Sequence, residues 1–251
     1  MSLSRFYSPH EFSSGSSFRL DKDLAHYLRN VLRGKPGDQV IIFNGRGGEF
    51  LAELVSIEKR DVSVRVIQFY PVDRESTLSI RLGISIVKRD AMNAILQKST
   101  ELGVTEIQPL IADNTTVSLK TIKQREEHWQ QRIVSACEQC GRNTLPILFP
   151  PMISSDWIKQ QTSQVKLALD LSGTYSLFDL GTGTDSLQDS KPEHISVLIG
   201  PEGGLSQQEL SLAESNQFLL IGLGQRILRA DTATITALSI LQARFGDLSP
   251  S

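Results

Sequence analysis

Two glycine-rich turns near the end of the chain contain the residues whose types and spacing could do chemistry. Residues 200–204 read Gly-Pro-Glu-Gly-Gly, and residues 222–229 read Gly-Leu-Gly-Gln-Arg-Ile-Leu-Arg. Each turn follows an apolar run that predicts a strand and precedes a segment with helical periodicity. Glycine lets the backbone approach a ligand closely, and open α/β sheets bind ligands beyond the carboxyl ends of their strands. The pair of turns therefore predicts a pocket for a small cofactor.

The common nucleotide-binding motifs do not describe these turns. The first lacks the Gly-Lys-Ser/Thr end of a P-loop, and the second lacks the third glycine of a dinucleotide fingerprint. Either turn alone is better explained as a tight strand-to-helix connection. The two turns together, with Arg226 and Arg229 between the helix-like segments, favour a binding site.

A third glycine-rich segment invites a different interpretation. Residues 177–184 read Leu-Phe-Asp-Leu-Gly-Thr-Gly-Thr, like the cofactor loop of Rossmann-type methyltransferases. Such a loop should open a helix, but turn-forming residues and Pro192 follow it. We therefore predict a surface loop at this position.

Composition places the chain among ordinary globular proteins. It has 251 residues, of which 39% are hydrophobic and 22% charged, enough for one large domain or two smaller ones. No apolar run has the length of a membrane span, and the first residues lack the apolar core of a signal peptide, so we expect a cytoplasmic protein. Residues 1–145 carry 20 basic and 17 acidic residues, whereas residues 146–251 carry 6 and 11. The excess in the first part is compatible with a polyanion contact or with a plain solvated surface.

The two cysteines, Cys137 and Cys140, form a CxxC pair that would suit redox chemistry or half of a zinc site. They continue an apolar helical stripe that starts at Trp129. No second pair and no suitably spaced histidine is present. Core packing is therefore the preferred interpretation, and no metal is expected.

The pattern of elements changes about one third of the way along the chain. Residues 1–70 predict short strands in a small β-barrel, with a hairpin around Asn44-Gly45 and one helix at residues 21–32. From residue 78, strands at 78–87, 106–112 and 165–169 alternate with helices at 90–102, 121–140 and 155–161. This alternation predicts a mainly parallel sheet covered by helices.

Helix boundaries are marked by capping residues. Ser206 with Glu209 forms a capping box. Asp90 and Asp231 are predicted to cap the helices that they precede, and Gly103 to stop the first of these.

Several segments together resemble the RsmE family of bacterial ribosomal RNA methyltransferases in the SPOUT superfamily. The match covers almost the whole chain and is carried by residues 5–7, 26–33, 43–45, 97–104, 136–142, 198–206 and 223–229. The Gly-Pro-Glu-Gly-Gly and Leu-Gly-x-Arg-Ile-Leu-Arg motifs in this order are its most specific part. The chain departs from the family at Asp231, where glutamate is usual, so the carboxylate reaches one methylene less far.

The resemblance implies an α/β fold in two domains. Residues 1–72 would form a PUA-like β-barrel that binds RNA, and residues 73–251 a SPOUT methyltransferase domain whose C-terminal part is tied in a trefoil knot. It also implies a homodimer that uses S-adenosylmethionine to methylate N3 of one uridine in 16S ribosomal RNA of the small subunit. Neither a membrane nor DNA is expected as a partner.

The turns and the resemblance together predict the site residues. The cofactor is expected to contact strand ends and turn residues, namely Leu169, Leu198, Gly200, Pro201, Glu202, Gly203, Ile221, Leu223, Gly224, Ile227 and Leu228. RNA is expected to contact basic and amide side chains of both domains, namely Arg5, Arg29, Arg33, Lys35, Arg89, Asn93 and Gln97.

Two roles in the reaction remain open between alternatives. Arg229 or Arg142 would stabilise the uracil anion, and Glu101 or Asp231 would accept the N3 proton or hold an arginine.

Two other functions compete with this one. A non-catalytic RNA-binding module with an incidental nucleotide pocket would bind RNA without transferring a methyl group. A Rossmann-type enzyme would depend on the loop at residues 179–184.

Overall fold

The computed structural model describes residues 3–58, 61–118, 121–122, 124–180 and 191–248 of the chain. The predicted surface loop at residues 177–184 lies partly outside this range. Contacts divide the chain into two compact units, of which the first comprises residues 1–75 and 137–145 and the second residues 76–136 and 146–251. The first unit thus includes a segment from the middle of the chain, beyond the predicted boundary at residue 72. Among the described residues, no helix combines the length and apolarity that a bilayer crossing requires.

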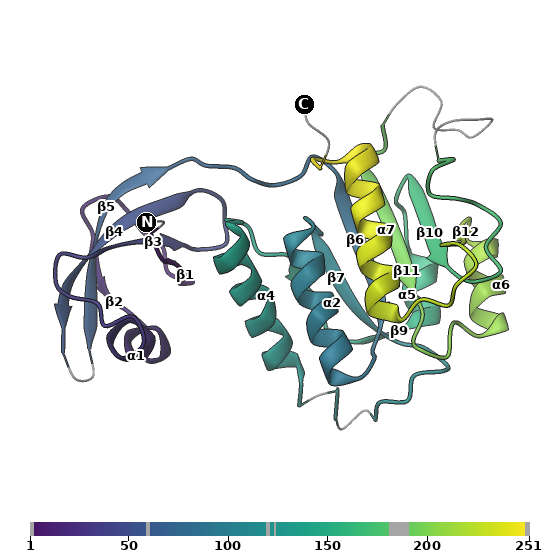
Figure 1. Cartoon of the computed structure of the whole chain (residues 1–251), viewed down its shortest axis with the longest axis horizontal. Coiled ribbons are helices and arrows are strands. Elements are labelled where there is room, and N and C mark those ends of the chain that lie inside the picture. Colours follow the sequence, from purple (N-terminus) through teal and green to yellow (C-terminus); the bar gives the residue numbers. More distant parts are fainter. Residues whose placement is uncertain (1–2, 59–60, 119–120, 123, 181–190, 249–251) are drawn as a thin grey trace. The chain divides into compact units, whose positions relative to one another are not determined.

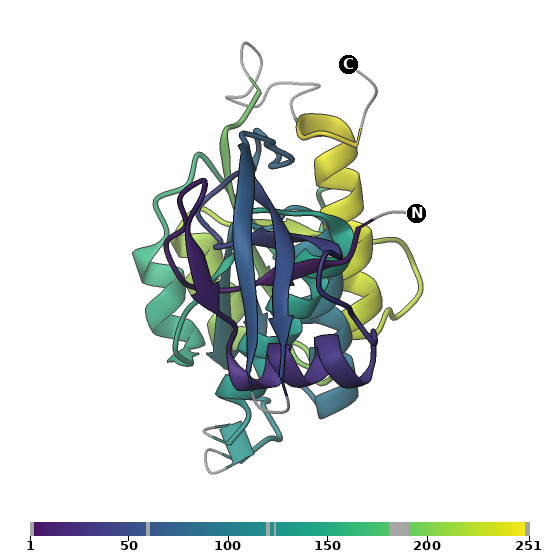
Figure 2. The same cartoon turned by 90° about the vertical axis from the view of Figure 1, so that its left-hand side faces the viewer.

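The first unit is a curled five-stranded sheet with one helix. Its strands follow the order β1-β3-β4-β5-β2, in which only β1 and β3 run parallel. In Figure 2, which views this unit from the front, α1 lies beside one end of the long strands β4 and β5. The bounds are β1 Arg5–Tyr7, β2 Ser17–Arg19, α1 Lys22–Asn30, β3 Gln39–Phe43, β4 Glu49–Ile57 and β5 Val62–Tyr70.

Alternating apolar side chains build the core of the first unit. Val62, Val64 and Val66 on β5 are buried, while the residues between them are half-buried or exposed. Leu28 of α1 packs into the same core. The half-buried strand and the short helix that the sequence predicted are thereby confirmed.

The second unit contains a seven-stranded, all-parallel sheet. Its order is β12-β10-β11-β6-β7-β8, with β9 also paired to β7. The strands are β6 Ser79–Ser85, β7 Glu106–Ile111, β8 Ile147–Leu148, β9 Met152–Ile153, β10 Val165–Leu169, β11 His194–Ile199 and β12 Leu219–Ile221. The helices are α2 Arg89–Glu101, α4 Glu126–Cys140, α5 Ser154–Gln160, α6 Gln207–Ser215 and α7 Ala230–Phe245. The last four residues of α4 are counted with the first unit.

Helices cover both faces of this sheet (Figure 1). Residues of α2, α4 and α7 share one buried cluster with Leu167 and Val197, whereas residues of α5 and α6 share another with Ala168 and Leu198. Successive strand side chains point to opposite faces, so these apolar runs are buried on both sides. The predicted parallel sheet with helices on its faces is confirmed.

Three predicted helix starts differ from the structure. Lys88 and Arg229 occupy the N-cap positions of α2 and α7, so Asp90 and Asp231 lie in the first turns, where their charge complements the helix dipole. Helix α4 begins at Glu126, five residues after the predicted start. The capping box of Ser206 and the positive φ of Gly103 at the end of α2 are confirmed.

The CxxC pair belongs to the packing of α4. Cys137 is fully buried, and burial raises the pKa of its thiol to about 12. Within the described parts of the chain, no group of three or more metal-ligating side chains is present. The burial of Cys137 agrees with the interpretation of the pair as core packing.

Candidate active site

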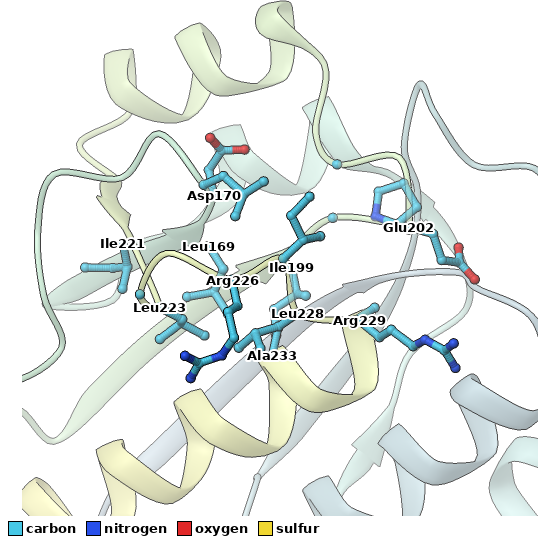
Figure 3. A pocket seen from close by; sticks show the side chains of 17 residues that line it. Leu169, Asp170, Ile199, Glu202, Ile221, Leu223, Arg226, Leu228, Arg229 and Ala233 are labelled. Carbon is cyan, nitrogen blue, oxygen red and sulfur yellow. The ribbon is translucent and has the colours of Figure 1, made fainter.

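A cavity of about 230 Å³ lies where β10, β11 and β12 end. Because these strands are parallel neighbours, their carboxyl ends meet at one edge of the sheet. The turns at residues 200–204 and 222–229 and the first turn of α7 close its walls (Figure 3). The structure therefore joins the two glycine turns in a single cleft.

The first glycine turn is held by contacts to the loop after β7. Asn114 Nδ2 donates to the carbonyl oxygens of Gly203 and Gly204, at 3.4 and 3.1 Å. The buried carboxylate of Glu209 accepts from the Ser206 amide, from the Asp113 amide and from a serine hydroxyl on α5. These bonds fix the turn and the start of α6 to the neighbouring strand ends.

The floor of the cleft depends on a close backbone approach at Gly173. The segment after β10 is hydrogen-bonded to β12 and the second turn through Asp170 N to Ile221 O, at 3.1 Å, and Gly222 N to Tyr175 O, at 3.0 Å. A Cβ on Gly173 would lie only 2.3 Å from the carbonyl carbon of Ile221. Only glycine permits this contact.

The second turn presents backbone groups that have no protein partner. Among the described residues, no N–H or C=O of residues 223–228 takes part in a hydrogen bond. Residues 224–227 are exposed and residues 223 and 228 half-buried, so these groups are accessible and could pair with the polar edge of a flat ligand in the cavity. Leu169, Ile199 and Leu228 supply apolar surface beside it.

Most of the predicted cofactor-binding residues line this cavity, but two do not. Leu198 is fully buried and points into the cluster on the opposite face of the sheet. Gly203 lies beside Asn114 rather than on the cavity wall. The lining residues in agreement with prediction are Leu169, Gly200, Pro201, Glu202, Ile221, Leu223, Gly224, Ile227 and Leu228.

Sequence reasoning missed several lining residues. Three of them adjoin predicted cofactor contacts, namely Asp170 and Leu171 after Leu169, and Gly204 in the glycine turn at residues 200–204. The other two, Ile199 and Ala233, belong to β11 and α7. The carboxyl end of a parallel strand was the signal for Asp170 and Leu171. Ala233 could not be found in this way, because its position depends on how α7 packs.

Charged side chains surround the cleft unevenly. In Figure 3, Glu202 and Arg229 extend on one side, while Asp170 lies at another wall with Leu169. Arg226 and Arg229 are exposed, and among the described residues neither forms an ion pair. A guanidinium in this position can donate to an anionic group of a substrate.

Of the four candidate catalytic residues, the structure brings only Arg229 to the cavity wall. Asp231 lies two positions further, in the first turn of α7, where its carboxylate accepts from the Thr232 amide at 2.8 Å. The charge at position 231 is thus close to the cavity without lining it.

Glu101 lies far from the cavity. It ends α2, which starts at the carboxyl edge of the sheet and runs for 13 residues, about 18 Å at 1.5 Å per residue. Its carboxylate forms an ion pair with Lys98 at 2.8 Å and accepts from Gln97 at 2.9 Å. These contacts favour a structural role over the predicted role as a base.

Arg142 is a buried, paired residue of the first unit. It is 4% exposed, and its guanidinium donates to both carboxylate oxygens of Glu75. A guanidinium engaged in this way is a structural element, which differs from the predicted role as a substrate donor.

Arg5 is also engaged within the first unit. Its side chain, 14% exposed, binds Glu49, the Asn143 side chain and the carbonyl oxygen of Gly141. Arg74 reaches the same Glu49 carboxylate at 2.9 Å. This network attaches residues 137–145 to the sheet and favours a structural role for Arg5.

The remaining predicted RNA contacts are on accessible surface. Arg33 and Lys35 are exposed, and Arg29 is half-buried with its Nε bonded to Asn30. On α2, Arg89 is exposed at the edge that carries the cavity, whereas Asn93 and Gln97 lie successively further along the helix.

Comparison with known proteins gives consistent matches over both units. Residues 74–242 match the family model of an RNA methyltransferase domain, and residues 20–67 match that of an RNA methyltransferase PUA domain. The ribosomal RNA small subunit methyltransferase E of Buchnera aphidicola is 34% identical over 98% of this chain and 98% of its own length. The protein of the same name from Rickettsia conorii is 33% identical over 95% of both chains.

Solved structures agree with these relatives. A putative methyltransferase from Legionella pneumophila, solved in complex with the cofactor SAM, is 36% identical with a TM-score of 0.92, covering 99% of this chain and all of the other. A ribosomal RNA small subunit methyltransferase E from Neisseria gonorrhoeae, bound to S-adenosyl methionine, is 34% identical with a TM-score of 0.89 and the same coverage. On this sequence and structural similarity, the chain belongs to the ribosomal RNA small subunit methyltransferase E family.

Proposed function

We propose that the protein transfers the methyl group of S-adenosylmethionine to N3 of a uridine in the 16S ribosomal RNA of the small subunit. The observation that carries this proposal is the cavity between the two glycine turns, with the unpaired backbone groups of residues 223–228 on its wall. Full-length relatives with this name, two of them at 33–34% identity, support the reaction.

The cleft fits such a cofactor by its chemistry. The backbone of residues 223–228 would pair with the edge of the adenine, and the apolar side chains of Leu169, Ile199 and Leu228 would contact its faces. The cofactor supplies an activated methyl group on a sulfonium. The protein therefore acts mainly by alignment of the two reactants, which contributes as much as about 7–11 kcal/mol.

Proton removal from N3 is the step that needs help from side chains. Transfer would join N3 to the methyl carbon as the carbon–sulfur bond breaks, and the N3 proton would have to pass to an acceptor. Arg229 would donate to a uracil oxygen and so stabilise the anion. Asp231, at the start of the same helix, would orient the arginine or accept the proton.

RNA would be held by exposed basic residues of both units. Arg29, Arg33 and Lys35 would contact phosphates from the barrel, and Arg89, Asn93 and Gln97 from α2. Their exposure, complete or partial, supports this assignment.

Two copies of the chain would form the working enzyme. Leu171 and Ile227 line the cavity, yet they are 62% and 81% exposed, and Phe178 is 64% exposed. Apolar side chains around a binding site commonly mark an interface. A second copy would cover them and complete the site.

Two further properties follow from the family. The C-terminal part of the chain would be tied in a trefoil knot. The protein would act in the cytoplasm, where ribosomal subunits are assembled.

The test is methyl transfer from labelled S-adenosylmethionine to small ribosomal subunits that lack the modification, followed by mapping of the labelled base. We expect the label on N3 of one uridine. RNA binding without any transfer would instead support a non-catalytic RNA-binding module, and a label on another base would reject the assigned substrate atom.

A further inference from the structure

A second cavity, of about 250 Å³, lies between α2 and the start of α4. Its walls come from the first residue of α2 and from the segment that leads into α4, namely Arg89, Thr121, Gln124, Arg125 and His128. Arg132 lies one turn beyond His128 and donates to its Nε2 over 3.4 Å. We call Arg89, Arg125, His128 and Arg132 the basic cluster.

The basic cluster lacks acidic partners. Elsewhere in the second unit, Arg81 pairs with Glu106 at 2.8 Å and Lys98 with Glu101 at 2.8 Å. Within the described residues, no member of the basic cluster forms such a pair, although Asp90, Glu126 and Glu127 are close in sequence. The arginine charges gathered around this cavity repel one another, so a bound anion would stabilise this arrangement.

A buried donor within the cluster points to a missing ligand. Nη1 of Arg125 is shielded from solvent and, among the described residues, has no hydrogen-bond partner. An unpaired buried donor costs on the order of 1–3 kcal/mol, more when it is charged. Arg125 lines the cavity, so reorientation of its guanidinium toward an anion there would satisfy this donor.

The pKa of His128 is affected by the arginines around it. Burial, followed by the charges of Arg132 and Arg89, lowers the pKa of its imidazole. The lowered pKa favours the neutral ring, whose nitrogens can share in hydrogen bonds with an anion and with Arg132. This effect agrees with the geometry of the cavity.

The basic cluster lies at the same sheet edge as the cofactor cleft. Strands β11 and β6 are parallel neighbours, with Ile199 opposite Ile84, so the turn after β11 is next to the segment that leads into α2. The segment that leads into α4 follows β7, the next strand of the sheet. Figure 1 shows the first turns of α2, α4 and α7 at one end of this unit.

We propose that the basic cluster binds a backbone phosphate of the RNA strand whose base enters the cofactor cleft. This inference rests on the proposed function, because it takes the substrate to be RNA. Arg89 and Arg125 would each donate to a phosphate oxygen, and Arg125 Nη1 would gain the partner that it lacks. The contact reads no base; it sets the position of the strand along the edge.

The experiment compares Arg89→Gln/Arg125→Gln with the wild type and with Lys159→Gln. Lys159 is an exposed cation of α5, on the opposite face of the sheet, so this control removes charge without touching the basic cluster. Binding to small ribosomal subunits without the modification is measured between 50 and 200 mM potassium chloride. Thermal unfolding and calorimetry with S-adenosylmethionine are run on all three proteins.

For the double variant we expect about tenfold weaker binding to subunits at 0.1 M salt. Two lost phosphate contacts should lower the slope of log affinity against log salt by about 1.4–1.8. Cofactor affinity and unfolding temperature should match the wild type, and in methyl transfer KM should rise while kcat changes little. Lys159→Gln should behave as the wild type.

Two results would overturn the inference. One is unchanged subunit affinity and salt slope in the double variant. The other concerns inorganic phosphate, whose binding is monitored through the NMR signals of His128. If the double variant loses phosphate binding while its affinity for subunits stays unchanged, the basic cluster is a site for free phosphate. Failure of the wild type to transfer methyl or to bind the cofactor would instead count against the proposed function, because the binding measurement does not depend on either.

Discussion

Arg229 was predicted from the sequence as a site residue, and the structure places it on the wall of the cleft. It lines the cleft, it is exposed, and it holds the N-cap position of α7 without a side-chain capping bond. Its guanidinium is therefore available to a substrate.

We predict that Arg229→Ala lowers the rate of methyl transfer by about 10²–10³, the usual loss when one donor to a developing anion is removed. Cofactor affinity should change much less, since the unpaired backbone of residues 223–228 is retained. Single-turnover transfer and calorimetry separate the two effects. Arg226→Ala, on the same turn, is the matched control; an equal loss of rate in both variants would argue against a specific role for Arg229.

At the scale of elements, the cleft depends on how closely its segments approach one another. Residues 170–175 are hydrogen-bonded to β12. The glycine turn at residues 200–204 and the start of α6 are bonded to the loop after β7 through Asn114 and Glu209. The site is therefore sensitive to changes that never touch a ligand.

We predict that Gly173→Ala destabilises the protein by about 1–3 kcal/mol, the usual cost of overpacking, and weakens cofactor binding. The added methyl group would meet the backbone of Ile221 and Gly222 within 2.4 Å. Gly203→Ala is the control, because its new methyl group would meet Asn114 at an ordinary 3.4 Å. Denaturant unfolding and calorimetry measure both quantities. Wild-type values for Gly173→Ala would show that β12 has room to shift.

At the scale of the whole molecule, residues 137–145 belong to the first unit although they follow 61 residues of the second. The Glu49 carboxylate links residues 137–145 to the five-stranded sheet, because it accepts hydrogen bonds from Arg5, Arg74 and Asn143. Burial raises its pKa, but hydrogen bonds from Arg74, Arg5 and Asn143 outweigh that effect, so the pKa of Glu49 lies below its ordinary value of 4.5.

We predict that Glu49→Gln destabilises the protein by on the order of 3 kcal/mol at pH 7, as for other buried pairs that lose one partner. A lowered folded-state pKa contributes stability above about pH 4.5, and this contribution is lost as the pH falls through the folded-state value. The difference between wild type and variant should therefore shrink below pH 4.5. Burial raises the pKa of Glu138, which makes stability depend on pH in the opposite direction. This contribution is the same in the wild type and the variant, so it cancels in the difference between their unfolding free energies.

The control for this experiment is Glu53→Gln on the same strand. Glu53 pairs with Arg65 at the surface, and such pairs contribute less than about 1 kcal/mol. Urea unfolding at pH 7, 5 and 3 gives the required differences. A pH-independent effect at Glu49 would mean that its charge contributes nothing to the attachment.

The proposed dimer is a property of the whole molecule as well. We predict that Ile227→Asp converts a dimer to a monomer in sedimentation experiments and weakens cofactor binding, because a buried charge at an apolar interface is costly. The control is Ile153→Asp. Ile153 is 54% exposed and lies on β9, which pairs with β7 on the side of the sheet away from β12 and β10. A wild type that sediments as a monomer would contradict the proposed assembly.

Local patterns in the sequence predicted most of the elements and the place of the cleft. Period-2 and helical patterns, capping residues and glycines are local signals, so the strands that end at Leu169, Ile199 and Ile221 could be predicted from them. The residues of the cleft wall were predicted from the glycine turns together with the family resemblance. The family motifs added the reaction, which no local pattern contains.

Which charged residues are available to a ligand depends on contacts between residues that are distant in the sequence. Arg5, Arg142 and Glu101 look like functional candidates in the sequence, but partners distant in sequence engage the two arginines, and the direction of α2 carries Glu101 to the far edge. The same packing brought Arg89 and Arg125 together at the edge that holds the cleft. Contacts of this kind depend on strand order and helix direction, which are set by the packing of the whole sheet rather than by neighbouring residues.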